Sequence, residues 1–478
     1  MCGIIGLLNS PETATEIFLG LENLQHRGQD GGGIITLDKG RFHQHRGIGL
    51  LENAFTASHL ARLTGNAGIG HTRYTTTGKK SLSQLQPFLS EMTGLVIAHN
   101  GNIVNYQQIC ESFHHNGYAA SATGCDSEVI LWTLERALST EGKTFEGLVN
   151  SIRTLSETLV GSYSVIGLCE GLGLFAFRDP NGLRPLVMGE QIRKGDTEKT
   201  YAFASETVAL SFLGFSEMVD IQPGEVVLVT PKGKVHRANY TSPKPRHCMF
   251  EWVYFARVES EIDELPVYQA RFNLGAALAE NIRATGLKPD IVVPVPETSR
   301  IAAIALAEQL GVPFREVLIK NRYVNRTFIL ESQAARQAAI RRKLYPVATE
   351  LSGKRILIVD DSIVRGNTAI QIIQMLRQCG AKEIYLASTC PPIQHPCYYG
   401  IDFPDENELL ASAHTVEELP KILGVDALIY QTIAGLEKSL KPNNLCMACL
   451  TDDYPTDISA AETYSKQRTL QRKEVLVS

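Results

Sequence analysis

Short apolar runs, each broken by turn residues at intervals of about ten positions, dominate the first half of the chain. The runs include IIGLL, GIITL, GLVIAHNGNIVNY, YSVIGL, GLFAF and EVVLVT, all before residue 230. They predict a sheet-rich domain with a few helices, such as one over residues 127–139. A polar, basic, proline-bearing stretch at 231–247 then predicts a domain boundary. We therefore expect a first domain over residues 2–235 and a second over 236–478.

Beyond the boundary, buried strands alternate with amphipathic helices. The strand IVVPVP precedes IAAIALAEQLG, whose apolar spacing is helical and whose final Gly311 stands where a helix C-cap would be. The strand RILIVDD leads to TAIQIIQMLRQCG, in which four apolar residues between 369 and 376 share one helical face, and then to the strand IYLAS. This order predicts an α/β domain with a doubly wound parallel sheet that binds ligands at the carboxyl ends of its strands.

Composition narrows the class of protein. Hydrophobic residues make up 44% and charged residues 20% of the 478 positions, which is typical of a globular chain. The net charge of −5 provides no general attraction to nucleic acid or to an acidic membrane, so we expect neither as a partner. The N-terminus lacks the basic region and cleavage site of a secretory signal, and we expect a cytoplasmic protein. Ten cysteines are too few for a disulfide framework and should be thiols, ligands or nucleophiles.

Cys2 follows the initiator methionine, whose removal would leave a thiol beside a free α-amino group. That amine has a pKa near 8, so it can accept the thiol proton at neutral pH. A small buried residue in a first strand is the alternative interpretation. Polar clusters at the ends of apolar runs favour the nucleophile: HRGQD (26–30), GHTRYTTTG (70–78), AHNGNIVNY (98–106) and CDSE (125–128).

With these clusters, residues 2–230 closely resemble the N-terminal-nucleophile glutamine amidotransferases. The resemblance implies an αββα sandwich, an α+β fold in which Cys2 attacks the glutamine side-chain amide. It places Asn100 and Gly101 in the oxyanion hole. It also implies a glutamine pocket containing Arg27, Arg73 for the α-carboxylate and Asp126 for the α-ammonium group. Cys125 replaces a more usual Ser or Thr beside Asp126.

The segment ILIVDDSIVRGNTA (356–369) carries a second chemical signal. Two adjacent carboxylates after a buried strand repel one another, a cost that binding of sugar hydroxyls or a metal justifies. The turn that follows offers backbone N–H groups and hydroxyls to a phosphate at a helix N-terminus. A solvated pair of aspartates at a strand end is the alternative interpretation.

This segment resembles the phosphoribosyl-diphosphate motif of the type I phosphoribosyltransferases. The resemblance implies that Asp360 and Asp361 hold the ribose hydroxyls. It implies that Mg²⁺ binds near Thr298 of PVPETSR together with the two aspartates. Asn367 and Ala369 replace the usual Thr and Ser. The residues implied to bind the 5′-phosphate are Ser362, Arg365, Gly366, Asn367 and Thr368.

Residues 320–343 carry seven basic side chains and one acidic one, a net charge of +6. A nucleic-acid arm and a solvated basic face are alternatives, but the segment lies between two phosphate-site elements and lacks a series of aromatic residues. A lid over a phosphorylated substrate fits better. The segment resembles the flexible loop of amidophosphoribosyltransferases, in which Lys343 matches a residue near the diphosphate.

The two halves together, in this order, resemble the amidophosphoribosyltransferase family. Membership implies hydrolysis of L-glutamine and transfer of the ammonia to C1 of phosphoribosyl diphosphate, the first committed step of purine synthesis. It also implies a homodimer or homotetramer inhibited by purine nucleotides. Hexosamine and asparagine synthetases share only the first half, and a non-catalytic sensor of phosphoribosyl diphosphate would lack the nucleophile.

The remaining signal is the C-x-x-C pair of Cys446 and Cys449, whose spacing lets two thiolates reach one metal. A pair of buried thiols is the alternative interpretation. One branch of the family binds a [4Fe–4S] cluster through such a pair, and the resemblance implies Cys248 and Cys397 as the other ligands. Zinc satisfies the same four thiolates on spacing alone.

Overall fold

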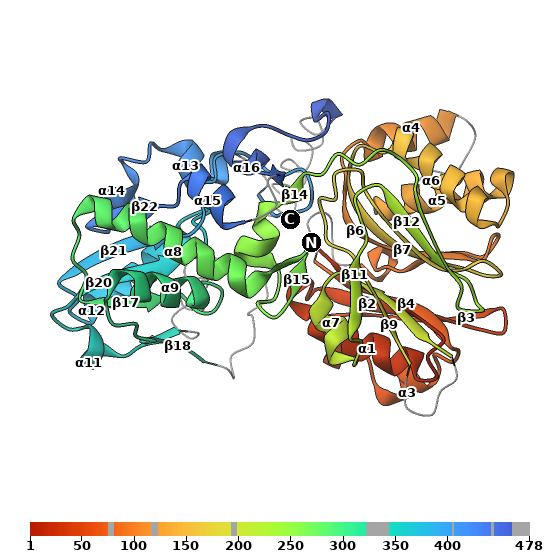
Figure 1. Ribbon diagram of the computed structural model, residues 1–478, viewed down its shortest axis with the longest axis horizontal. Helices are drawn as coiled ribbons and strands as arrows, with labels where there is room; N and C mark the ends of the chain where they lie inside the picture. The colour runs from red at the N-terminus through yellow and green to blue at the C-terminus, as the bar shows by residue number, and fades with distance from the viewer. Residues whose placement is uncertain are drawn as a thin grey trace.

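The computed structural model describes residues 1–74, 81–115, 123–192, 198–321, 344–403, 406–440 and 444–460. The chain forms two domains that lie side by side, with the N-terminus at the junction between them (Figure 1). The predicted basic lid, with Lys343, lies outside the described residues except at its first two positions. No helix within the described ranges is long and apolar enough to cross a membrane.

The first domain is a sandwich of two antiparallel sheets. One sheet has the order β11-β9-β10-β1-β4-β2-β3 and the other β13-β12-β8-β7-β6-β5. The strands of the first sheet are β11 (Glu217–Asp220), β9 (Val187–Gln191), β10 (Thr200–Ala204), β1 (Gly3–Leu8), β4 (Ala67–Arg73), β2 (Gly31–Asp38) and β3 (Arg41–Ile48). Those of the second are β13 (Val235–Asn239), β12 (Glu225–Val229), β8 (Gly173–Arg178), β7 (Gly161–Cys169), β6 (Leu95–Ile103) and β5 (Phe88–Ser90).

Alternating apolar residues of these strands build the core between the sheets. Ile4 and Ile69 of the first sheet pack with Val96, Ile166 and Val227 of the second, and all five are fully buried. Helices cover the outer faces: α1 (Thr13–Asn23) and α7 (Thr207–Phe212) on the first sheet, α5 (Ser127–Glu141) and α6 (Phe145–Thr158) on the second. The expected αββα sandwich and the helix expected at 127–139 are confirmed.

The second domain is built on a parallel sheet of order β17-β20-β21-β22. Its strands are β17 (Ile291–Pro294), β20 (Arg355–Asp360), β21 (Glu383–Ser388) and β22 (Ala427–Tyr430). Helices α8 (Val267–Thr285) and α9 (Arg300–Leu310) pack on one face, and α12 (Asn367–Gln378) packs on the other. The four apolar residues expected on one face of α12 are buried there. The doubly wound sheet is therefore confirmed.

The chain leaves the first domain within the predicted boundary stretch 231–247, but after the division expected at residue 235. Residues Val235–Asn239 form β13, which pairs with β12 at the edge of the second sheet, so the expected boundary after residue 235 falls inside this strand. The chain then forms β14 (His247–Cys248), which pairs in parallel with β23 (Leu445–Cys446). This pairing places Cys248 opposite Cys446.

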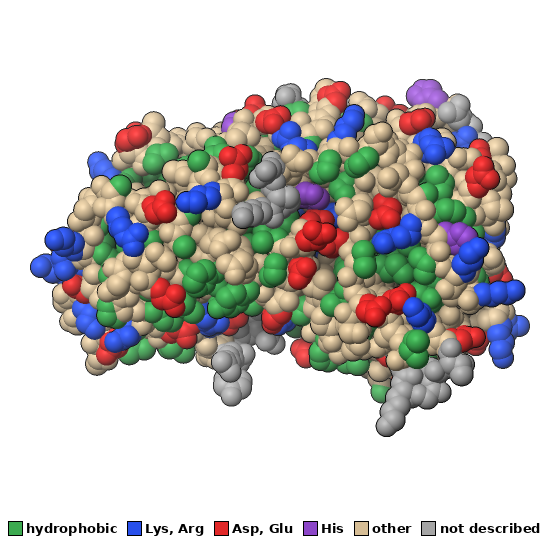
Figure 2. Space-filling view, viewed as in Figure 1, with side chains coloured by type: hydrophobic (Ala, Val, Ile, Leu, Met, Phe, Trp, Pro, Cys, Tyr) green, Lys and Arg blue, Asp and Glu red, His purple; other side chains and the backbone are tan. Residues whose placement is uncertain are grey.

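Shorter elements complete the description. They are η1 (Gln25–Arg27), α2 (Leu51–Ala54), α3 (Ala57–Ala61), η2 (Leu82–Gln84), α4 (Tyr106–His115), η3 (Glu251–Phe255), β15 (Glu261–Ile262), β16 (Leu265–Pro266), β18 (Leu318–Lys320), β19 (Leu344–Pro346), α11 (Ala348–Leu351), η4 (Glu406–Glu408), α13 (Leu410–Ala413), α14 (Leu419–Leu423), α15 (Ile433–Ser439) and α16 (Ala448–Thr451). On the face shown in Figure 2, acidic and basic side chains are interspersed.

Candidate active sites

Cys2 lies at the start of β1, in the middle of the first sheet, and is half-buried. Its backbone N–H donates to Asn100 Oδ1 at 3.0 Å. Met1 precedes it with only 3% of its surface exposed, and the Met1 amine donates to Gly400 O at 3.1 Å. Burial lowers the pKa of this amine. If Met1 were removed, the new α-amine would be the Cys2 nitrogen that Asn100 already holds.

Asn100 and Gly101 lie side by side on β6, close to Cys2. Asn100 Oδ1 accepts the hydrogen bond from Cys2. The Nδ2 of the same side chain is buried and has no hydrogen-bond partner among the described residues. An unsatisfied buried donor costs about 1–3 kcal/mol, so its retention favours a ligand that it meets during the reaction. At Gly101 a Cβ atom would lie 2.0 Å from Ser162 O, so only glycine fits against β7 there.

Arg73 and Asp126 approach the same end of the sandwich from different elements. Arg73 ends β4, and its guanidinium donates to the carbonyl and side-chain oxygens of Gln84 at 2.5 and 2.8 Å. Asp126 precedes α5 and accepts from the N–H of Ile103, three residues after Asn100. The structure thus places both expected glutamine ligands near the end of β6.

Arg27 is placed differently from the expectation. Its side chain is fully buried, its Nε bonds to Glu206, and its Nη2 bonds to Glu251 at 2.8 Å. The guanidinium is therefore occupied by protein carboxylates rather than open to a glutamine pocket. Burial alone would raise the pKa of Glu206, but Arg27 and His26 outweigh it and hold that pKa well below its usual value.

The second constellation lies at the carboxyl edge of the parallel sheet. Asp360 ends β20, and Asp361 N donates to Asp360 Oδ1 at 3.0 Å, while Ser362 Oγ donates to Asp361 Oδ1 at 2.8 Å. Burial and then the neighbouring Asp361 raise the pKa of Asp360 well above its usual value. Burial raises the pKa of Asp361 to about 6. This is the arrangement in which a cation or hydroxyl donors relieve an unfavourable pair of charges.

The loop after Asp361 ends in a helix N-terminus. Gly366 has φ 73° and caps α12, whose first residues Asn367 and Thr368 are exposed. Their backbone N–H groups are therefore available to an anion. Arg365, which the resemblance implies to bind the 5′-phosphate, forms an ion pair with Glu408 at 2.6 Å.

Neighbouring β17 brings the other predicted loop to this edge. Val295 N donates to Val359 O at 2.8 Å, so the chain containing Thr298 leaves the sheet next to Asp360. Thr298 is half-buried, and the following Ser299 bonds back to Val295 O at 2.6 Å. Two predicted ligand loops thus meet at the carboxyl edge of adjacent parallel strands.

Comparison with known proteins identifies the two domains and the family. A glutamine amidotransferase domain model matches residues 71–212, and a phosphoribosyl transferase domain model matches residues 261–402. An amidophosphoribosyltransferase of Methanothermobacter thermautotrophicus is 42% identical over 98% of both chains, and one of Pasteurella multocida is 43% identical over 93% of this chain and 90% of its own. The chain belongs to the amidophosphoribosyltransferase family.

Solved structures support the assignment to this family. The B. subtilis glutamine phosphoribosylpyrophosphate amidotransferase complexed with ADP and GMP has a TM-score of 0.84 at 37% identity, covering 96% of this chain and 98% of its own. The activity of the family is to hydrolyse glutamine and to transfer the ammonia to phosphoribosyl diphosphate, which yields phosphoribosylamine, glutamate and diphosphate. This activity begins purine biosynthesis, and the expected function is confirmed.

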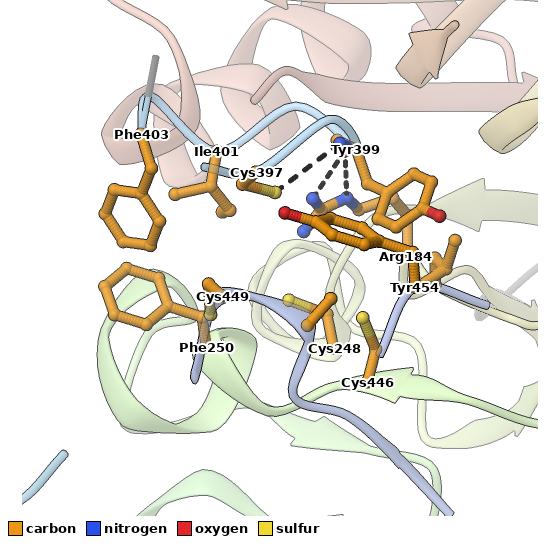
Figure 3. A pocket seen from close by; sticks show the side chains of 12 residues that line it. Arg184, Cys248, Phe250, Cys397, Tyr399, Ile401, Phe403, Cys446, Cys449 and Tyr454 are labelled. Atoms are coloured by element: carbon orange, nitrogen blue, oxygen red, sulfur yellow. Dashed lines mark hydrogen bonds between the residues drawn. The ribbon is translucent and has the colours of Figure 1, made fainter. Parts of the chain in front are cut away.

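All four cysteines expected to bind metal line one cavity in this member of the family (Figure 3). Cys397 approaches from the segment after β21, and Cys248, Cys446 and Cys449 approach from the opposite side. Cys390, which lies seven residues before Cys397, is also buried but does not line the cavity. Burial raises the pKa of the Cys248 thiol to about 11, and burial and neighbouring thiols raise that of Cys449 well above its usual value.

Two charged residues beside the first site, Glu251 and Arg184, were not found from sequence motifs. Glu251 bridges Arg27 and Arg184, the latter at 3.3 Å, and Arg184 donates to Tyr399 O at 3.0 Å. All three charged side chains are nearly inaccessible to solvent. Glu251 and Arg184 belong to no motif and lie far from Arg27 in the sequence, so only the folded chain shows that the three meet.

Proposed function

We propose that Cys2 is the nucleophile of the glutaminase half-reaction and that Asn100 Nδ2 and the Gly101 N–H form its oxyanion hole. The observation that carries this proposal concerns the two polar atoms of the Asn100 side chain. Its Oδ1 accepts a hydrogen bond from the Cys2 nitrogen, while its buried Nδ2 remains available as a donor. A thiolate attack on the glutamine amide develops charge on the amide oxygen, where preorganised donors typically contribute about 3 kcal/mol. Collapse of the intermediate releases ammonia and leaves a glutamyl thioester on Cys2.

Arg73 and Asp126 are proposed to hold the α-carboxylate and α-ammonium groups of glutamine. The anchoring of Arg73 by Gln84, and of Asp126 by Ile103 N, supports this assignment because a fixed charge loses little entropy on binding. Arg27 is left out of the pocket. We assign it to the ion pairs with Glu206 and Glu251.

At the second site, Asp360 and Asp361 are proposed to accept hydrogen bonds from the ribose hydroxyls of phosphoribosyl diphosphate. The N-terminal turn of α12, with Ser362, Gly366, Asn367 and Thr368, is proposed to bind the 5′-phosphate, and Lys343 to approach the diphosphate. The raised pKa values of the two aspartates support a partner that donates hydrogen bonds or positive charge. Mg²⁺, held by Thr298 and the aspartates, would supply positive charge to the departing diphosphate.

For the four cysteines we propose a [4Fe–4S] cluster rather than zinc. The four thiols line one cavity, and the branch of the family that this cysteine pattern resembles binds a cluster through such a set. Zinc would suit the same four thiolates, so the resemblance is what favours iron.

Purine nucleotides are proposed as feedback inhibitors, because the structure of the B. subtilis relative was solved with ADP and GMP. We also propose a cytoplasmic homodimer or homotetramer that uses neither nucleic acid nor a membrane.

The assignment of residues is tested by diphosphate release from phosphoribosyl diphosphate with Mg²⁺, using either glutamine or an ammonium salt as nitrogen source. We expect Asn100→Ala to lower only the glutamine-dependent rate, by about 100-fold or more. Equal loss of both rates in a folded Asn100→Ala variant would contradict the oxyanion role.

A further inference from the structure

Three consecutive backbone carbonyls of the second domain accept hydrogen bonds from the first domain beside its active site. The side-chain amide of Asn102 donates to Tyr398 O at 2.8 Å, and the hydroxyl of Ser162 donates to Tyr399 O at 2.9 Å. The Met1 amine donates to Gly400 O in the full chain, and this contact is lost when Met1 is removed, so the bonds to Tyr398 O and Tyr399 O are the ones that persist. Residues Tyr398–Gly400 therefore form a platform of acceptors under the end of the sandwich.

Two of these donors belong to the strand pair that carries the oxyanion hole. Asn102 follows Gly101 on β6, and Ser162 lies opposite Asn102 on β7. Ser162 Oγ also accepts from the N–H of Asn102 at 3.2 Å, so a single hydroxyl joins β6 to Tyr399 O. The Ser162 side chain is fully buried.

The platform also packs against the oxyanion hole directly. A Cβ atom on Gly400 would lie 3.3 Å from Gly101 O, so the two backbones are in close contact. The same segment begins at the second site, where Thr389 N donates to Asp360 O at 3.0 Å and Thr389 Oγ1 donates to Asp361 O at 3.1 Å. Residues 389–400 thus run from one active site to the other.

We propose that Tyr398–Gly400 holds the oxyanion strand in its reactive geometry and that Ser162 is the positioning residue that joins the two. The inference rests on the oxyanion role proposed above for Asn100 and Gly101. Donors that act on the developing charge affect the transition state more than the bound substrate. A shifted strand should therefore lower kcat for glutamine and leave KM nearly unchanged.

The test compares Ser162→Ala with Ser151→Ala. Ser151 is the control: its side chain is also fully buried and its hydroxyl donates to a backbone carbonyl at 2.7 Å, but that carbonyl is Gly147 O of its own helix α6. We expect Ser162→Ala to lower kcat for glutamine hydrolysis by about 10-fold or more, with KM and the ammonia-dependent rate within about twofold of the parent. Ser151→Ala should change none of these quantities, and Ser162→Thr, which retains a hydroxyl, should restore kcat.

Equal effects of the two alanine variants, or a parallel loss of the ammonia-dependent rate, would overturn the proposal. If Ser162→Ala does not fold, Asn102→Ala tests the same platform from a half-buried position, and an unchanged kcat there also overturns it. Asn100→Ala distinguishes the platform proposal from the oxyanion proposal. Loss of glutaminase activity in Asn100→Ala but not in Ser162→Ala would contradict only the role of the platform. Full activity of Asn100→Ala would contradict the oxyanion role on which the platform proposal rests.

Discussion

At the scale of single residues, two cysteines near the proposed glutamine pocket should differ in their reactivity as nucleophiles. Cys2 stands at the chain start beside Asn100, whereas Cys125 contacts Asp126, and burial raises the pKa of its thiol to about 12. Cys125 therefore stays protonated and is a poor nucleophile.

We expect Cys2→Ala to lower glutamine-dependent synthesis at least ~1,000-fold while synthesis from ammonium salts persists, because the thiol serves only to release ammonia. Cys125→Ser, the control, should retain both activities. Diphosphate release with each nitrogen source measures the outcome, and a folded Cys2→Ala protein that loses both activities would contradict the division of labour.

We expect the Asp360–Asp361 pair to lower the stability of the free protein while it serves the binding of substrate. Asp361 is 8% exposed, and burial raises its pKa to about 6, so the folded state binds a proton more tightly than the unfolded chain does. Stability therefore falls as the pH rises through about 4 to 6, and the full penalty is present above that window.

In the absence of Mg²⁺ and substrate, Asp361→Asn should raise the free energy of unfolding at about pH 7.5 by about 2–3 kcal/mol, and this gain should vanish near pH 4. Asp360→Asn combined with Asp361→Asn should also abolish synthesis with either nitrogen source. Urea unfolding at both pH values tests the sign. Asp290→Asn, at an exposed aspartate that pairs with Arg355, should give no such gain.

At the scale of elements, periodicity predicted several of the buried strands and amphipathic helices. The apolar face of α12, the cap at Gly311 and the buried strand before Asp360 follow from side-chain spacing alone, because each needs only its own sequence and a core to face. Strand β13 was missed because VHRAN is an edge strand with half-exposed residues, so it lacks the apolar signal.

Gly366 offers a test at this scale. It has φ 73°, and a Cβ there would lie 2.9 Å from Leu410 Cδ2, whereas Gly311 has φ 67° and no atom within 4 Å of its Cβ position. Both alanine substitutions should cost about 1 kcal/mol of backbone strain. Gly366→Ala should additionally displace the phosphate-binding turn.

We therefore expect Gly366→Ala to raise KM for phosphoribosyl diphosphate by about 10-fold or more with both nitrogen sources, and Gly311→Ala to leave KM unchanged. Steady-state kinetics and urea unfolding of the two variants separate binding from stability. Equal KM values in the two variants would show that the turn does not bind the phosphate.

At the scale of the whole molecule, the interface between the domains is the part that sequence patterns did not reveal. The family resemblance implied that Arg27 belongs to the glutamine pocket, and in the structure its guanidinium is engaged by Glu251 of the other domain. The pairing partner lies 224 positions away and carries no motif. The resemblance, by contrast, picked out four cysteines as expected metal ligands, and the fold brings all four to one cavity.

That cavity joins the interface to the second domain. Cys248 follows the linker from the first domain, Cys397 lies next to the Tyr398–Gly400 platform, and Cys446 and Cys449 come from the last described segment. A cluster bound to all four would close loops of the chain and lower the entropy of its unfolded state. Its expected contribution is therefore to stability.

Protein purified without oxygen should be brown and contain about four iron and four sulfide per chain, and exposure to oxygen should remove colour and stability together. Cys449→Ser should be colourless or depleted in iron and should unfold at a lower urea concentration, because one ligand is lost from a buried cavity. Cys390→Ser, a buried thiol outside the cavity, should keep its full iron content. Stoichiometric zinc in colourless anaerobic protein would replace the cluster with a zinc site, and unchanged iron in Cys449→Ser would remove this residue from the ligand set.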